Sequence, residues 1–139
     1  MSIRTVLLVG VVAAACAAPA RAAETPEDLA QKAAESWLKL TDAGDAAASW
    51  EQAAKPFKAA VTKEQWVQAL GSVRPPLGKV VSRKLTSRQS TEKLPGGPDG
   101  KYVVIQYQTE FEKKASAVET IIPALDSDGV WRVSGYFIR

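Results

Sequence analysis

Apolar residues recur every three to four positions in the first half of the chain, which predicts helices. The longest stripe occupies residues 29–40 and follows Thr25-Pro26, where the threonine is suited to cap a helix and the proline to open it. Two shorter helices are expected over residues 46–53 and 63–70. The segment Pro-Pro-Leu-Gly at residues 75–78 then ends the helical part of the chain.

Beyond this segment the apolar period changes to two, which predicts β-strands. The strand over residues 102–111 has the clearest alternation, and others are expected over 80–90, 117–125 and 130–138. Glycine- and proline-rich segments typical of turns separate them. The pattern therefore predicts an α+β fold, with about three N-terminal helices packed on a four-stranded antiparallel sheet.

Residues 1–22 have the organisation of a secretory signal peptide. Arg4 supplies a positive charge, about a dozen apolar residues follow, and Ala20-Arg21-Ala22 offers a small-residue cleavage site. Removal of this segment leaves residues 23–139 as a single α+β domain. We therefore expect a periplasmic or secreted protein with no integral membrane span in the mature chain.

Two other interpretations of this leader stay open. Cleavage before Cys16 and acylation of its sulfur would make the protein a lipoprotein, although Ala13 stands where lipoprotein signals usually have leucine. Alternatively, the segment stays uncleaved as a membrane anchor, which its short apolar run disfavours.

The composition of the 139 residues excludes several classes of function. With no histidine and one cysteine, the chain has no imidazole metal site, no histidine base and no intrachain disulfide, so neither a metal nor a cofactor is expected. The formal charge is +3, but loss of Arg4 and Arg21 leaves 16 basic residues against 15 acidic ones. This near balance gives no bulk attraction to nucleic acid.

Several aromatic and turn residues carry a resemblance to a known family. They include Trp37-Leu38, Ser49-Trp50, Leu94-Pro-Gly, Tyr102-Val-Val and the terminal Asp128-Gly-Val-Trp-Arg-Val-Ser-Gly-Tyr136. These motifs resemble the small exported bacterial domains called domain of unknown function 4019, from about Ala30 to Arg139. The resemblance implies export and a cystatin-like cone of the kind seen in nuclear-transport-factor-2-like proteins. It implies no activity.

A candidate ligand site consists of aromatic residues expected between the helices and the sheet. Curved sheets under helices often leave a mouth there, and ligand pockets are mostly apolar with a few polar groups. The same residues have the spacing of ordinary core residues, so a filled core is the competing interpretation. The candidate pocket-lining residues are Trp37, Trp50, Trp66, Tyr107, Trp131 and Tyr136.

The charged residues offer weaker signals. No carboxylate has apolar neighbours that force its burial, so we expect Asp42 and Glu119 to be solvated at the surface. Asp126-Ser-Asp128 lacks the later oxygen ligands of a calcium loop and is interpreted as a hairpin turn. In a regular strand Arg83 and Arg88 would face opposite ways, which favours a charged edge strand over a binding patch.

Three hypotheses about function follow. The leading one is non-catalytic binding of a small apolar or amphipathic ligand, or of a protein partner, in the cell envelope. The alternative is an isomerase- or hydrolase-like enzyme, which requires a buried carboxylate within reach of Tyr107 or Tyr136. The third is a structural envelope protein that associates through its sheet.

Overall fold

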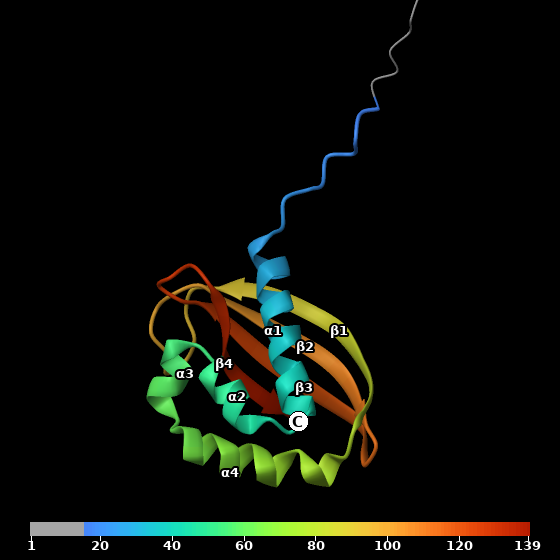
Figure 1. Ribbon diagram of the computed structural model, residues 1–139, viewed down its shortest axis with the longest axis vertical. Helices are drawn as coiled ribbons and strands as arrows, with labels where there is room; N and C mark the ends of the chain where they lie inside the picture. Colours follow the sequence, from blue (N-terminus) through green and yellow to red (C-terminus); the bar gives the residue numbers. More distant parts are fainter. Residues whose placement is uncertain (1–15) are drawn as a thin grey trace, which may run out of the picture.

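The computed structural model describes residues 16–139 and has the expected α+β architecture (Figure 1). Most of the predicted signal peptide lies outside the described residues, and residues 16–25 are exposed and form no helix or strand. The helices are α1 (Pro26–Asp42), α2 (Ala46–Glu51), α3 (Lys55–Ala60) and α4 (Lys63–Val73), and the strands are β1 (Val80–Thr91), β2 (Tyr102–Phe111), β3 (Lys114–Leu125) and β4 (Trp131–Ile138).

The helix starts follow the capping signals of the sequence. Thr25 accepts a hydrogen bond from the Asp28 amide at the start of α1, and Thr62 does the same for the Gln65 amide in α4. About three helices are predicted, and in the described residues α3 is a fourth. The sequence conceals it because proline is typical of chain breaks, but Pro56 occupies the first turn of α3, where a helix makes no use of the missing N–H.

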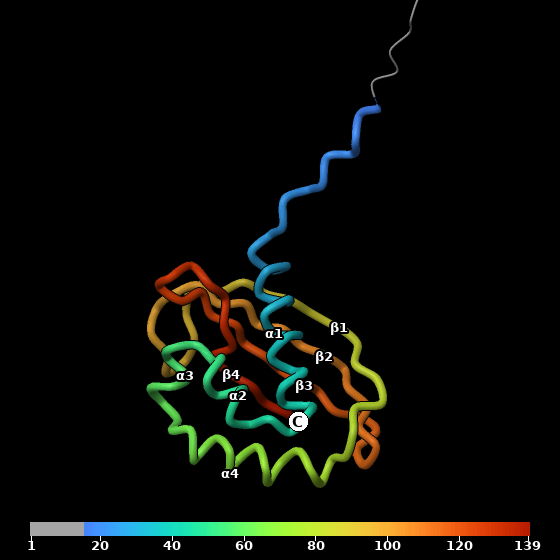
Figure 2. Tube along the Cα trace, in the orientation of Figure 1, coloured from blue at the N-terminus to red at the C-terminus, as the bar shows by residue number. Residues whose placement is uncertain are grey.

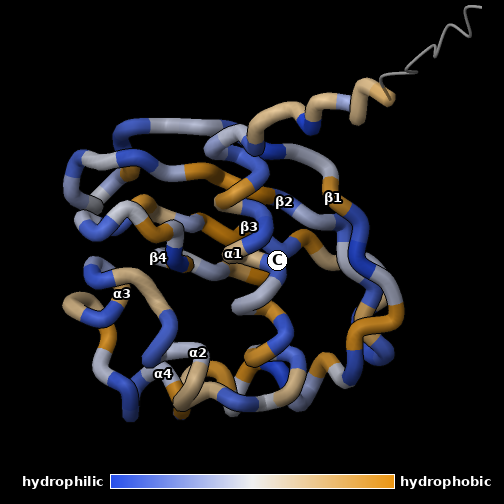
Figure 3. The backbone as a smooth tube through the Cα atoms, turned by 45° about the horizontal axis from the view of Figure 1, so that its top comes forward, coloured by the Kyte–Doolittle hydropathy of each residue, from blue (hydrophilic) through white to orange (hydrophobic). Residues whose placement is uncertain are grey.

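The four strands form one antiparallel sheet in sequence order, β1-β2-β3-β4, which leaves β1 and β4 as its edges. The α1 helix crosses one face of the sheet, and α2, α3 and α4 lie around one side of it (Figures 1 and 2). Between α1 and the sheet lies the main core, which includes Trp37, Leu38, Ile105 and Ile121. The hydrophobic stretches of β2 and β3 run through this interior, whereas β1 is mostly hydrophilic (Figure 3).

The edge position of β1 is confirmed, but the expected alternation of its arginines is wrong. The register shifts between Val80 and Ser82 and again between Leu85 and Ser87. As a result Arg83 and Arg88 both lie opposite residues of the buried face of β2. Both arginines therefore turn toward the helices and form ion pairs with residues of α1.

One buried serine in α2 joins α1 to α4. The carbonyl of Ser49 accepts a hydrogen bond from Trp37 Nε1 at 2.8 Å, and its hydroxyl accepts one from Trp66 Nε1 at 2.9 Å. The two indole rings lie 5.8 Å apart, centroid to centroid. Because Ser49 is fully buried, these bonds form in a low-dielectric interior and fix the N-terminal part of α4.

Candidate functional site

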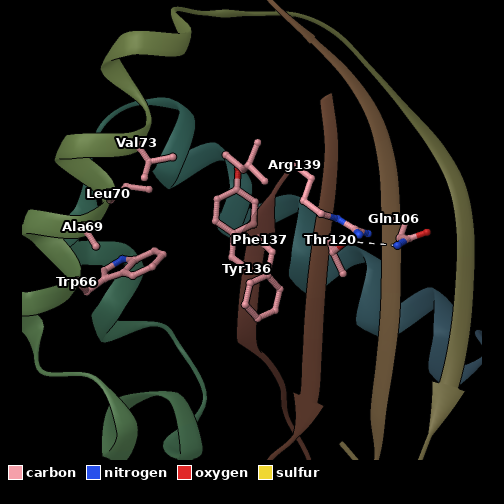
Figure 4. Close-up of a pocket in the computed structure, with 10 residues that line it drawn as sticks. Trp66, Ala69, Leu70, Val73, Gln106, Thr120, Tyr136, Phe137 and Arg139 are labelled. Carbon is pink, nitrogen blue, oxygen red and sulfur yellow. Dashed lines mark hydrogen bonds between the residues drawn. The ribbon is translucent and has the colours of Figure 1, made fainter. Parts of the chain in front are cut away.

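An apolar groove separates α4 from β4, the open edge of the sheet (Figure 4). Its volume is about 590 Å³, within the range of ligand pockets. The α4 helix forms one wall with Trp66, Ala69, Leu70 and Val73. The other wall consists of β4 and the neighbouring strands, with Tyr136, Phe137, Ile138, Arg139, Thr120 and Gln106.

A second hollow of about 620 Å³ continues the groove past Trp66. The two hollows share Trp66, Tyr136 and Phe137, and the second one extends between α3 and the turn that joins β1 to β2. Its lining includes no charged residue, whereas the first hollow is lined by one, Arg139. We call the two hollows together the α4–β4 groove.

The structure brings two of the six candidate aromatic residues, Trp66 and Tyr136, to this groove. Trp37 lies behind them in the core, where its ring makes an edge contact with Tyr136 at 5.3 Å between centroids. The other three lie elsewhere: Tyr107 is in the core, Trp50 is bonded through Nε1 to the Val61 carbonyl, and Trp131 lines two smaller hollows.

The groove's aromatic side chains are held in place by contacts within the protein. The Ser49 hydroxyl fixes the Trp66 indole, and Phe57 packs edge-on against the same ring at 5.0 Å between centroids. Tyr136 donates its hydroxyl hydrogen to a carboxylate oxygen of Glu119 in the interior. Fixed side chains lower the entropy cost of binding.

The expectation that Glu119 is solvated is wrong, because its exposed fraction is 0%. Arg83 from β1 pairs with both carboxylate oxygens, with Nε at 2.7 Å and a terminal nitrogen at 3.1 Å. The hydroxyls of Thr109 and Tyr136 donate to the same carboxylate. A buried charge is tolerable only with such partners.

Asp42 is exposed at the surface, as expected, but it also extends the same network to the helices. Arg83 contacts Asp42 at 2.8 and 3.0 Å, and Arg74, directly after α4, contacts it at 2.9 Å. The Arg74 guanidinium also lies over the Phe111 ring at 5.1 Å. We call Asp42, Arg74, Arg83 and Glu119 the ion network. The negative charges of its two carboxylates balance the positive charges of its two guanidinium groups.

The charges of the network also shift the pKa values of Tyr136 and Asp42. Burial raises the pKa of the Tyr136 hydroxyl, and the negative charge of Glu119 raises this pKa further, so that Tyr136 stays a hydrogen-bond donor. Burial alone would raise the pKa of Asp42. The hydrogen bonds and positive charges of Arg83 and Arg74 outweigh that effect and hold the pKa of Asp42 below its ordinary value.

Sequence reasoning could have found Glu119 from strand parity. It lies two positions from Ala117 and two from Ile121, so it shares their inward face. Its partner was harder to identify, because the bulges of β1 set the direction of Arg83. The groove residues on α4 carried no signal beyond ordinary amphipathicity.

Loss of the Glu119 charge should destabilise the fold. We expect Glu119→Gln to lower the free energy of unfolding by about 3–5 kcal/mol, because Arg83 then lies partly buried opposite a neutral group. Urea unfolding measures this difference. Glu110→Gln, on the exposed face of β2, is the matched control and should change stability by less than about 0.5 kcal/mol. Equal effects of the two substitutions would show that the buried pair contributes little.

The stability contributed by Asp42 should disappear in acid. Because its pKa is lower in the folded chain than the ordinary 3.8, Asp42 stabilises the fold at pH values above about 4, and this contribution is lost as the pH falls through the folded value. Asp42→Asn should therefore be less stable than wild type by about 2 kcal/mol near neutrality, with a gap that closes in acid. Unfolding curves at several pH values measure the gap. Asp99→Asn, an exposed change, serves as the control, and a gap that stays constant with pH would contradict the assignment.

Two further properties concern only the described part of the chain. Within residues 16–139 no group of three or more Cys, Asp or Glu side chains is arranged to hold a metal ion. Over the same residues no helix combines the length and the apolar character needed to cross a bilayer.

Comparison with known proteins places the chain in a family. The family described as protein of unknown function (DUF4019) matches residues 33–136, so the chain belongs to it. This match covers α1 through β4 and confirms the resemblance seen in the sequence. No curated protein and no solved structure matches the chain significantly.

Proposed function

We propose that this protein is an exported, non-catalytic binding module whose α4–β4 groove takes an apolar or amphipathic ligand or partner segment. The observation that carries the proposal is the pair of adjoining hollows, of about 590 and 620 Å³, beside an open sheet edge. Exposed Phe137, at 59%, and Val73, at 48%, give the groove an apolar rim that a ligand would cover.

The enzyme hypothesis has one observation in its favour, the bond from Tyr136 to buried Glu119. Both oxygens of that carboxylate already accept hydrogen bonds from Arg83. The Tyr136 hydroxyl donates its hydrogen bond to Glu119 in the interior, and not into the groove. A general base needs a free lone pair directed at its substrate. The contacts of Glu119 therefore support a structural role, and we favour binding over catalysis.

The proposal extends to the type of fold and to a location in the cell envelope. Helices over one face of a four-stranded antiparallel sheet are consistent with a cystatin-like cone, and we retain that assignment as a proposal. The remaining alternative is a structural envelope protein that associates through its sheet. A monomeric mass at high protein concentration would count against this alternative.

Export predicts a defined mature mass. Protein purified from the envelope of its own host should begin at Ala23, because cleavage follows Ala20-Arg21-Ala22. Mass spectrometry of the denatured protein measures this. A chain that begins at Cys16 and carries extra acyl mass would show that the protein is anchored by lipid and not freely exported. A full-length mass in the membrane fraction would show that the signal peptide is not cleaved.

Ligand binding in the groove is tested with N-phenyl-1-naphthylamine, an uncharged apolar dye. Wild type should bind the dye, and Val73→Asp should weaken binding at least about tenfold by placing a charge in the groove wall. Fluorescence titration measures both dissociation constants. Val67→Asp is the matched control, because Val67 lies on the same helix with similar exposure but lines a different hollow.

Absence of dye binding to wild type, or equal loss in both variants, would remove the groove as the ligand site. The folded state of each variant is checked by far-UV circular dichroism before the titrations are compared.

A further inference from the structure

We propose that the occupant of the α4–β4 groove is an extended peptide segment of another protein, which adds to β4 as a fifth strand. This inference rests on the proposed function, since it names the class of partner for the same groove. Three features of the groove favour a peptide: the backbone of the edge strand, the faces on its two sides and the charge at one end.

The backbone of β4 has an unpaired side. Arg139 and Val118 exchange both backbone hydrogen bonds, at 2.9 and 3.0 Å, so the antiparallel ladder turns alternate residues toward β3. By this alternation the N–H and C=O groups of Tyr136 and Ile138 point away from β3, toward the groove. Within residues 16–139 no loop or side chain bonds to them.

The open stretch has a defined end on the α3 side. The Ala54 amide donates to the Val133 carbonyl at 2.8 Å, so the start of α3 already occupies the edge of β4 at that residue. The edge is therefore free from Ser134 to Ile138, a length that suits a short peptide. Main-chain bonds at such an edge supply affinity, and pockets for alternate side chains supply specificity.

An added strand would find apolar surface on both of its faces. Alternate side chains of a strand point to opposite faces, so one set would lie beside Tyr136 and point toward Trp66 and Leu70. The other set would lie beside Phe137 on the outer face (Figure 4), where Ile122 lines the adjoining hollow. This geometry selects a peptide with apolar residues on both faces.

An aliphatic chain fits the same space less well. If it covered β4, the outward N–H and C=O groups of Tyr136 and Ile138 would lose water and gain no partner. Each such group is unfavourable when it is buried without a hydrogen-bond partner. A peptide backbone supplies the matching acceptors and donors, so the edge discriminates in favour of a strand.

A second copy of the chain is also disfavoured. If two β4 strands paired about a two-fold axis normal to the sheet, both copies would present their helices on the same side. The α4 helix lies beside β4 on that side, so the two α4 helices would meet over the junction (Figures 1 and 4). A single extended segment avoids this conflict.

Charge adds a further requirement on the peptide. Arg139 is the charged residue that lines the groove, and in the described part of the chain its guanidinium pairs with no carboxylate side chain. A peptide with an acidic residue at the Arg139 end complements it. The full inference is therefore an extended, largely apolar segment with a carboxylate beside Arg139.

The experiment begins with a random octapeptide library displayed on phage and selected on the full protein. We expect enriched peptides to contain apolar residues along the strand and an acidic residue near one end. In synthetic copies of these peptides, binding should slow hydrogen exchange at the Tyr136 and Ile138 amides, as measured by NMR. The Phe137 amide, already bonded to β3, is the internal control.

Variants test the two parts of the inference. Ile138→Pro removes one outward N–H and should weaken peptide binding at least about tenfold, whereas Ile138→Val keeps that N–H and should bind nearly as wild type. Arg139→Glu should weaken binding of acidic peptides by a similar factor. Lys84→Glu makes the same charge change on exposed β1 and should leave binding unchanged.

Each contrary outcome has a separate meaning. If peptides bind without slowing exchange at Tyr136 and Ile138, strand addition is overturned. If no peptide is enriched while the apolar dye still binds the groove, the inference fails and the proposed function stands. If the Tyr136 and Ile138 amides are protected in a dimer without peptide, the edge binds a second copy of the chain and the inference is overturned. If wild type does not bind the apolar dye, the proposed function itself fails.

Discussion

The ion pair between Arg83 and Glu119 is the interaction on which the rest of the structure depends. Glu119 is fully buried in the middle of β3, so the chain must bring it a cation and further donors. Arg83 reaches it from β1 and also contacts Asp42 at the end of α1. A single guanidinium therefore joins the edge strand, a central strand and the helix that crosses them.

The anchoring of α4 explains why a groove exists beside β4. Two partly buried contacts hold α4 near its ends: Trp66 bonds to Ser49, and Arg74, which follows the helix, pairs with Asp42 of the ion network. Both partners lie in the helical layer or at its edge, so the helix is anchored there rather than against β4. Tyr136 belongs to both regions, because its ring lines the groove and its hydroxyl meets Glu119.

The sequence predicted the elements better than the site, for physical reasons. Periodicity and capping signals act locally, so α1, α4 and the four strands could be identified, while Pro56 concealed α3 because it suits a first turn as well as a break. The burial of Glu119 depends on Arg83, which is 36 residues away and turned inward by bulges. Trp66 and Tyr136 are among the predicted pocket residues, but their spacing does not distinguish them from core residues such as Trp37.

The two edges of the sheet differ in how they avoid pairing with other strands. The β1 edge is long, bulged and hydrophilic, features that oppose addition of another strand. The β4 edge from Ser134 to Ile138 has no lysine or proline. Its pairing with β3 is regular from Gly135 to Ile138, with a register shift at Ser134, and the edge is bounded by the Ala54–Val133 bond. Its protection comes instead from α4, which narrows access to the width of the groove. A barrier of this kind opposes the approach of another sheet but leaves room for one extended chain, which is the geometry that the proposed peptide requires.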